Sequence, residues 1–157
     1  MRWASKRLAV LLVLGATQAC AADAEPLPGE NTAPLTVEQR AAMALEHAVL
    51  TWADAVGWAP AVDSIRFEVP ADDADRTTAM WDAETSTLVL VPMRIGSDQH
   101  RWEAVVMHEV GHAYGLGHVA DPTAVMNAIP NTTACVHESD AAELERVLHV
   151  KAKPSCS

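Results

Sequence analysis

The chain has 157 residues, half of them are apolar, and its formal net charge at pH 7 is −10. A chain of this length and composition can form one globular domain with a hydrophobic core. The negative charge argues against nucleic acid as a partner, because phosphates would be repelled. With 7 glycines and 9 prolines the sequence is not of low complexity, and it contains no internal repeat.

Residues 1–21 have the three-part layout of a bacterial export signal. The basic stretch "MRWASKR" precedes the apolar run "LAVLLVLGA", and the small, polar "TQACA" follows. An apolar run of about nine residues is too short for a membrane-spanning helix, which needs roughly twenty. A buried N-terminal helix would fit poorly with the cations of this stretch. We therefore expect export, and we find no other segment that is long and apolar enough to span a membrane.

The cysteines, Cys20, Cys135 and Cys156, leave two routes of processing open. If Cys20 is lipidated at the end of the signal, the protein is held at the membrane through that lipid alone. If cleavage follows Ala21 instead, Cys20 is removed and the protein is secreted. In both cases Cys135 and Cys156 remain as a candidate disulfide. Such a bond would close a loop of about twenty residues and contribute about 3 kcal/mol in an oxidising compartment.

Residues 22–35 are rich in proline and acidic residues and lack periodicity, so we expect a flexible leader. The folded domain then comprises residues 36–157. Its first helix is predicted to begin at Thr36, which can form a capping box with Gln39, and to end at Gly57. Apolar residues recur between these ends at helical spacing: Val37, Ala41, Ala44, Leu45, Ala48, Val49 and Trp52.

The rest of the domain is predicted to contain strands followed by helices. The elements are a strand at 64–70, a hairpin at 77–92 that turns at Asp82 to Ser86, a helix from Ser97 or Asp98 to Gly115, and a helix capped by Ser139 with Ala142, Leu144, Val147 and Leu148 on its buried side. Aspartates in the loop between the strand and the hairpin could bind calcium, although a solvated loop is the more common role of such a segment. This order indicates an α+β fold with a small sheet.

The helix that ends at Gly115 carries the sequence "HEVGHAYGLGH". His108 and His112 are four residues apart, so their imidazoles project from one face of the helix and one zinc ion can bridge them. Glu109 is offset around the helix and can act as general base toward a water on the metal. Gly115 can adopt the left-handed conformation that ends the helix, so that the chain turns back and brings His118 in as third ligand. A helix with merely exposed histidines is disfavoured, because all five fixed positions of the pattern occur by chance on the order of once in 10⁴ such chains.

This sequence resembles the long zinc signature of the metzincin metalloendopeptidases, and Met126 lies where their Met-turn follows the third histidine. The likeness is greatest to the matrixins in a minimal bacterial form. It implies one catalytic zinc held by His108, His112 and His118, with Glu109 as general base and Met126 as an apolar floor that does not bind the metal. It also implies a small, mostly parallel, twisted sheet with an active-site helix, a Met-turn loop and a C-terminal helix.

The chain departs from the family pattern at several positions. Val119 follows the third histidine, where matrixins usually have serine. No tyrosine follows Met126, and we expect Tyr114 to serve packing. The leader lacks the cysteine motif that keeps some matrixins latent, and no histidine and aspartate pattern indicates a second, structural zinc.

We expect a peptide substrate to lie extended along the strand at residues 87–92 and to pair with it through backbone hydrogen bonds. The segment from Asn127 to Thr133 is expected to form the wall of the pocket for the side chain that follows the scissile bond. The pocket is predicted to be lined by Asn127, Ala128, Ile129 and Pro130. The alanine, isoleucine and proline among them favour an apolar side chain.

The sequence thus predicts an exported, monomeric zinc endopeptidase that hydrolyses extracytoplasmic proteins through a zinc-bound water and a glutamate base. Its substrates would be peptides or proteins in general, one dedicated partner, or the protein's own leader. The alternative is a zinc-binding interaction domain without turnover. Glu109 speaks against that alternative, because a domain that only binds has no need of a carboxylate there.

Overall fold

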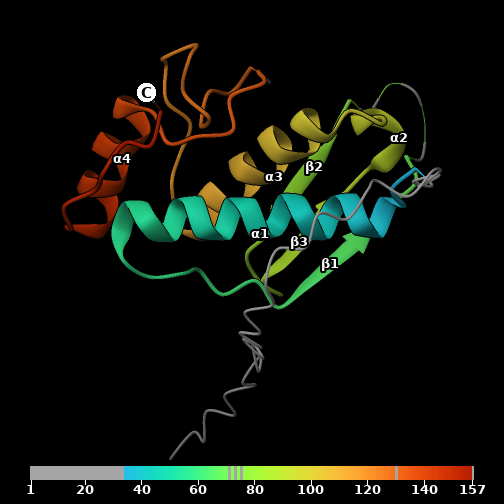
Figure 1. Cartoon of the computed structure of the whole chain (residues 1–157), viewed down its shortest axis with the longest axis horizontal. Coiled ribbons are helices and arrows are strands. Elements are labelled where there is room, and N and C mark those ends of the chain that lie inside the picture. Colours follow the sequence, from blue (N-terminus) through green and yellow to red (C-terminus); the bar gives the residue numbers. More distant parts are fainter. Residues whose placement is uncertain (1–33, 71, 73, 75, 130, 157) are drawn as a thin grey trace, which may run out of the picture. The chain divides into compact units, whose positions relative to one another are not determined.

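The computed structural model describes residues 34–70, 72, 74, 76–129 and 131–156. The predicted signal at 1–21 with Cys20, nearly all of the leader at 22–35, and Pro130 lie outside the described residues. The elements in chain order are α1 (Val37–Val56), β1 (Ser64–Phe67), β2 (Ala79–Asp82), β3 (Thr87–Leu90), α2 (Pro92–Ile95), α3 (Gln99–Ala113) and α4 (Glu138–Leu148) (Figure 1). The predicted α+β order is confirmed, and the short α2, which begins with a proline, is an addition.

The sheet has three strands in the order β1-β3-β2. β3 pairs with β1 in parallel and with β2 as an antiparallel hairpin, so the sheet is mixed rather than mostly parallel. All four residues of β3 are buried. The expectation that a substrate pairs with residues 87–92 is therefore wrong, because both edges of β3 are already occupied. The strand edge available beside α3 belongs to β2, which α3 contacts.

Helix α1 forms as its sequence predicts and packs along α3. The Thr36 hydroxyl accepts the Gln39 N–H and the Gln39 side chain accepts the Thr36 N–H, which completes the capping box. Gly57 ends the helix with φ 89°, a conformation that glycine adopts without strain. The buried face consists mainly of alanines, which lets α3 approach closely, and Trp52 donates its indole N–H to the Met107 carbonyl at 2.9 Å. The buried residues of α1 are Ala41, Ala44, Ala48, Trp52 and Ala55.

Helix α4 begins two residues earlier than predicted. His137 is its N-cap, so Ser139 lies within the first turn and donates its hydroxyl to Asp121 rather than capping the helix. The buried face is Asp140, Ala141 and Leu144, whereas Ala142 is exposed. Ala142 was assigned to the buried face in place of Asp140, because a carboxylate was not expected there.

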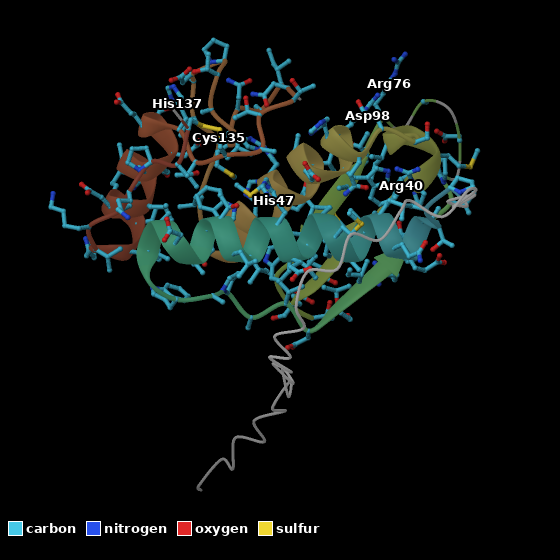
Figure 2. The ribbon with its side chains drawn as sticks, in the orientation of Figure 1. Arg40, His47, Arg76, Asp98, Cys135 and His137 are labelled. Carbon is cyan, nitrogen blue, oxygen red and sulfur yellow. A yellow bond between two sulfur atoms is a disulfide. The ribbon has the colours of Figure 1, made fainter. Side chains whose placement is uncertain are left out.

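The segment between α3 and α4 is joined to the C-terminal tail and to α1. The disulfide expected between Cys135 and Cys156 is present, and Val136 accepts hydrogen bonds from the backbone of Ser155 and Cys156. His47 is half-buried, and its Nε2 donates to the Ala134 carbonyl at 2.8 Å (Figure 2). Within the described residues, no helix is both long and apolar enough to cross a bilayer.

Candidate functional site

Three histidines converge at the C-terminal end of α3. His108 and His112 lie one turn apart on the helix, and Gly115 with φ 79° turns the chain so that His118 faces them. One nitrogen atom from each ring lies within 4.8 Å of the other two, and Nε2 of His108 is 3.2 Å from Nε2 of His118. The three predicted ligands are thus brought together in one cluster.

Backbone carbonyls orient two of these rings. Nδ1 of His108 donates to the Val125 carbonyl at 2.7 Å, and Nδ1 of His112 donates to the Leu116 carbonyl at 2.8 Å. A carbonyl oxygen can only accept, so Nδ1 carries the proton in each ring and Nε2 keeps its lone pair. Burial lowers the pKa of both imidazoles and favours the neutral form that binds metal. This donor set fits a tetrahedral dication with one open position.

Met126 lies next to Val125, whose carbonyl accepts Nδ1–H of His108. Its side chain is fully buried and packs against Gly111, where a Cβ would overlap the Met126 sulfur and approach Trp52 within 3.1 Å. Glycine is therefore required at position 111 by the close approach of the Met-turn to α3. The sequence pattern gave no reason to single out this glycine.

The Met-turn is also held from the other side, by Asp140 of α4. This carboxylate is completely buried and accepts the N–H groups of Val125, Met126 and His137 at 3.0, 3.0 and 2.9 Å. Sequence reasoning missed Asp140. Its spacing to Leu144 and Val147 on one helix face was the available signal, because a charged residue in a buried row needs partners.

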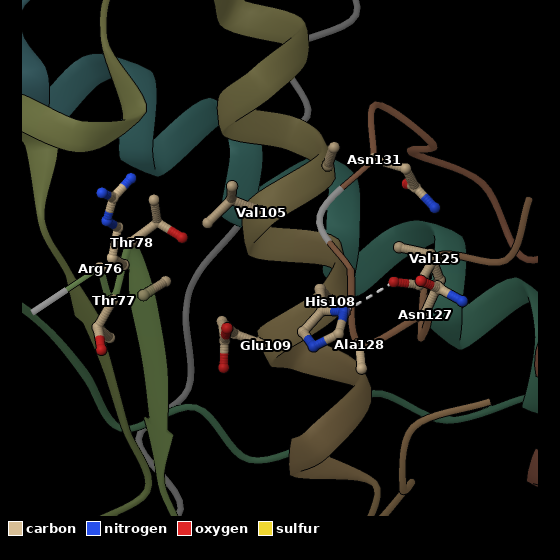
Figure 3. A pocket seen from close by; sticks show the side chains of 12 residues that line it. Arg76, Thr77, Thr78, Val105, His108, Glu109, Val125, Asn127, Ala128 and Asn131 are labelled. Carbon is tan, nitrogen blue, oxygen red and sulfur yellow. Dashed lines mark hydrogen bonds between the residues drawn. The ribbon is translucent and has the colours of Figure 1, made fainter. Parts of the chain in front are cut away.

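Glu109 lies beside His108 and faces the space between α3 and β2 (Figure 3). It is only 9% exposed, and burial raises the pKa of its carboxyl to about 7, while the backbone N–H of Trp81 in β2 acts in the opposite direction as a hydrogen-bond donor. A carboxyl with a pKa near neutrality is suited to accept and return a proton.

A pocket of about 410 Å³ opens beside Glu109 and His108. Residues 76–79 before and at the start of β2 form one wall, Ala104 and Val105 of α3 another, and the loop of Val125, Asn127, Ala128 and Asn131 the third (Figure 3).

The predicted pocket wall is only partly recovered. Asn127 and Ala128 line the pocket, whereas Ile129 is 76% exposed and does not. Sequence reasoning missed Arg76, Thr78 and the two α3 residues one turn before the histidine and the glutamate. Helical spacing could have indicated Ala104 and Val105. The positions of Arg76 and Thr78 depend instead on how the sheet is assembled.

The model of the matrixin family (Peptidase_M10) matches residues 38–147. This range extends from the first turn of α1 to the last turn of α4, and it contains the three histidines, Glu109, Met126 and Asp140. A comparison with curated proteins finds no significant match. Because the family model covers most of the chain, and the fold and the histidine cluster agree with it, the protein belongs to the matrixin family of metallopeptidases.

Proposed function

We propose that the protein is a zinc-dependent endopeptidase in which His108, His112 and His118 hold one catalytic zinc ion and Glu109 is the general base. One observation carries the proposal. The Nε2 lone pairs of the oriented histidines converge, and the Glu109 carboxylate faces the same pocket beside them. Packing does not explain the position of Glu109, because a buried carboxyl without a cationic partner destabilises a fold.

Zinc held by these histidines would supply a Lewis acid that polarises the peptide carbonyl and activates water. Glu109 then accepts the proton of the attacking water. The same carboxyl returns this proton to the leaving amine nitrogen as the peptide bond breaks, so the glutamate ends the cycle in its starting form. A bound dication would lower the pKa of Glu109 from the value that burial alone imposes, because it favours the carboxylate.

The free edge of β2 is suited to hold the substrate backbone. The Val91 N–H donates to the Thr78 carbonyl at 2.9 Å, so the backbone groups of Thr78 point toward β3. Because these groups alternate in direction along an antiparallel strand, those of Ala79 and Trp81 point to the free edge. Trp81 uses its N–H toward Glu109, and Ala79 lines the pocket. A peptide added to this edge would pass directly over the candidate base.

The protein is proposed to act outside the cytoplasm. The Cys135–Cys156 disulfide supports an oxidising compartment. The sequence of residues 1–21 supports export, and both the lipid anchor at Cys20 and release by cleavage after Ala21 are consistent with it.

Zinc content and proteolysis of the full chain test this function together. We expect one zinc per chain by elemental analysis, cleavage of unfolded casein, loss of cleavage with a chelator, and recovery on adding zinc. Folded protein that contains one zinc but cleaves no unfolded protein or peptide mixture would favour the alternative, a zinc-binding domain without turnover. Folded protein that binds no zinc would contradict both.

A further inference from the structure

The pocket beside Glu109 contains one arginine, Arg76, among its described lining residues. Arg76 precedes β2, and its guanidinium lies at the end of the pocket away from Glu109 and His108 (Figure 3). No hydrogen bond or ion pair joins it to another described residue. A guanidinium in such a position is a ready partner for a carboxylate.

The two asparagines of the pocket use both of their side-chain N–H groups in hydrogen bonds within the loop. Nδ2 of Asn127 donates to the Val119 and Asp121 carbonyls, and its Oδ1 accepts the Ile129 N–H. Asn131 is bound in the same way, since Nδ2 donates to the Pro122 and Ala124 carbonyls and Oδ1 accepts the Thr133 N–H. Both amides hold the loop, and neither has an unbonded N–H with which to select a ligand.

The other lining residues are aliphatic on two walls and polar on the third. Ala104, Val105 and Val125 contribute aliphatic carbon, whereas Arg76 and Thr78, across the pocket from Val105, contribute a guanidinium and a hydroxyl. Val105 precedes Glu109 by one turn, which places it about 6 Å farther along the helix from the reacting groups. A side chain that fits has an aliphatic stem and an anionic end.

We infer that Arg76 selects glutamate as the residue that follows the scissile bond. The two methylene groups of glutamate would lie against Ala104 and Val105, and its carboxylate would meet the guanidinium of Arg76. This inference rests on the proposed endopeptidase activity and replaces the apolar preference expected from Ile129 and Pro130. Because the chain is acidic as a whole and Arg76 is exposed, the selectivity is moderate rather than absolute.

Peptides that differ only in the residue after the scissile bond test the inference. The zinc-loaded full chain is assayed with glutamate, glutamine, leucine or lysine at that position. We expect kcat/KM for the glutamate peptide to exceed that for lysine by about tenfold or more, and that for glutamine by roughly three- to tenfold.

Charge reversal assigns the preference to Arg76. We expect Arg76→Glu to lower the glutamate-to-lysine ratio of kcat/KM at least tenfold, and Arg76→Ala to bring it close to one. Arg40→Glu is the matched control, because it makes the same charge change on α1, outside the pocket lining, and should keep the ratio within twofold (Figure 2). Each ratio is measured within one protein, so a change in overall activity does not affect it.

A wild-type chain that cleaves the leucine peptide faster than the glutamate peptide would overturn the inference, and so would a ratio that Arg76→Glu leaves unchanged. Both results would leave the endopeptidase function intact. Absence of cleavage of every peptide by the zinc-loaded wild type would instead contradict the proposed function itself.

Discussion

The buried carboxylate of Asp140 accepts the backbone N–H of Met126 at 3.0 Å and thereby joins α4 to the turn that contacts His108. The same carboxylate accepts the N–H of Val125, whose carbonyl in turn accepts Nδ1–H of His108. The backbone of Val125 therefore links Asp140 to His108 of the candidate metal centre. It is a positioning residue, since it touches neither metal nor substrate.

Substitution of Asp140 by alanine should weaken both folding and metal binding. Two buried N–H groups and the partly buried N–H of His137 would lose their acceptor, and each loss at a buried group costs about 1–3 kcal/mol. We expect urea denaturation of the metal-free protein to show a loss of about 3–5 kcal/mol, and zinc affinity, measured by chelator competition, to fall at least tenfold. The control Glu138→Gln removes an exposed carboxylate of the same helix and should cost less than about 1 kcal/mol. Unchanged zinc affinity in Asp140→Ala would show that the Met-turn does not orient His108.

The contact between Gly111 and Met126 gives a second prediction. In an exposed helix position glycine to alanine stabilises by about 1 kcal/mol, but here the added Cβ would overlap the Met126 sulfur. We expect Gly111→Ala to destabilise the protein by about 1–3 kcal/mol in thermal or urea unfolding.

A double-mutant cycle isolates this contact. In a Met126→Ala background the side chain that the new Cβ would meet is shortened, so Gly111→Ala should then cost little. An equal cost in both backgrounds would locate the problem at Trp52, the other side chain near position 111, rather than at Met126.

The pKa of Glu109 predicts how the stability of the metal-free protein depends on pH. Folding raises the pKa of this carboxyl from 4.5 to about 7, so between these values the folded state holds a proton that the unfolded chain has released. Its contribution therefore becomes less favourable as pH rises from about 4.5 to about 7, and it is constant above that range. Glutamine at this position would not titrate.

We expect chelator-treated Glu109→Gln to gain stability relative to chelator-treated wild type as pH rises from 4.5 to 8. The gain should reach up to about 3 kcal/mol, at roughly 1.4 kcal/mol per pKa unit. Titration of the histidines is common to both proteins and cancels in the difference. Urea unfolding at several pH values measures it, and a difference that does not vary with pH would contradict the raised pKa.

The disulfide should stabilise the segment that carries the pocket wall. Cys135 lies four positions after Asn131, the last residue of this wall, and the bond to Cys156 ties it to the C-terminal tail over a sequence separation of 21. Replacing both cysteines by serine should cost about 2–4 kcal/mol. Dithiothreitol should lower the Tm of the wild type but not that of the double variant, and an equal response of both would show that the bond does not contribute.

The sequence predicted the parts of this fold that depend on near neighbours. The Thr36–Gln39 capping box, the hairpin turn at residues 82–86 and the histidine spacing all depend on residues within about ten positions of one another. The family model likewise agrees with the resemblance that the motif gave.

What the sequence could not supply was pairing between distant segments. The parallel pairing of β1 with β3 leaves β2 at the edge beside α3, and no local pattern states this. The buried position of Asp140 depends on the Met-turn, and the position of Arg76 depends on the sheet edge. The apolar pocket was predicted from consecutive residues of one loop, whereas three separate segments line it.

The most direct test of the central claim compares the zinc-loaded full chain with its Glu109→Gln variant for both zinc content and cleavage of casein. Glutamine keeps the shape of the side chain but cannot accept the proton of water, so we expect one zinc in both proteins and a loss of kcat/KM of at least about a hundredfold in the variant. Cleavage by Glu109→Gln at the wild-type rate with zinc retained would show that Glu109 is not the base and would contradict the account.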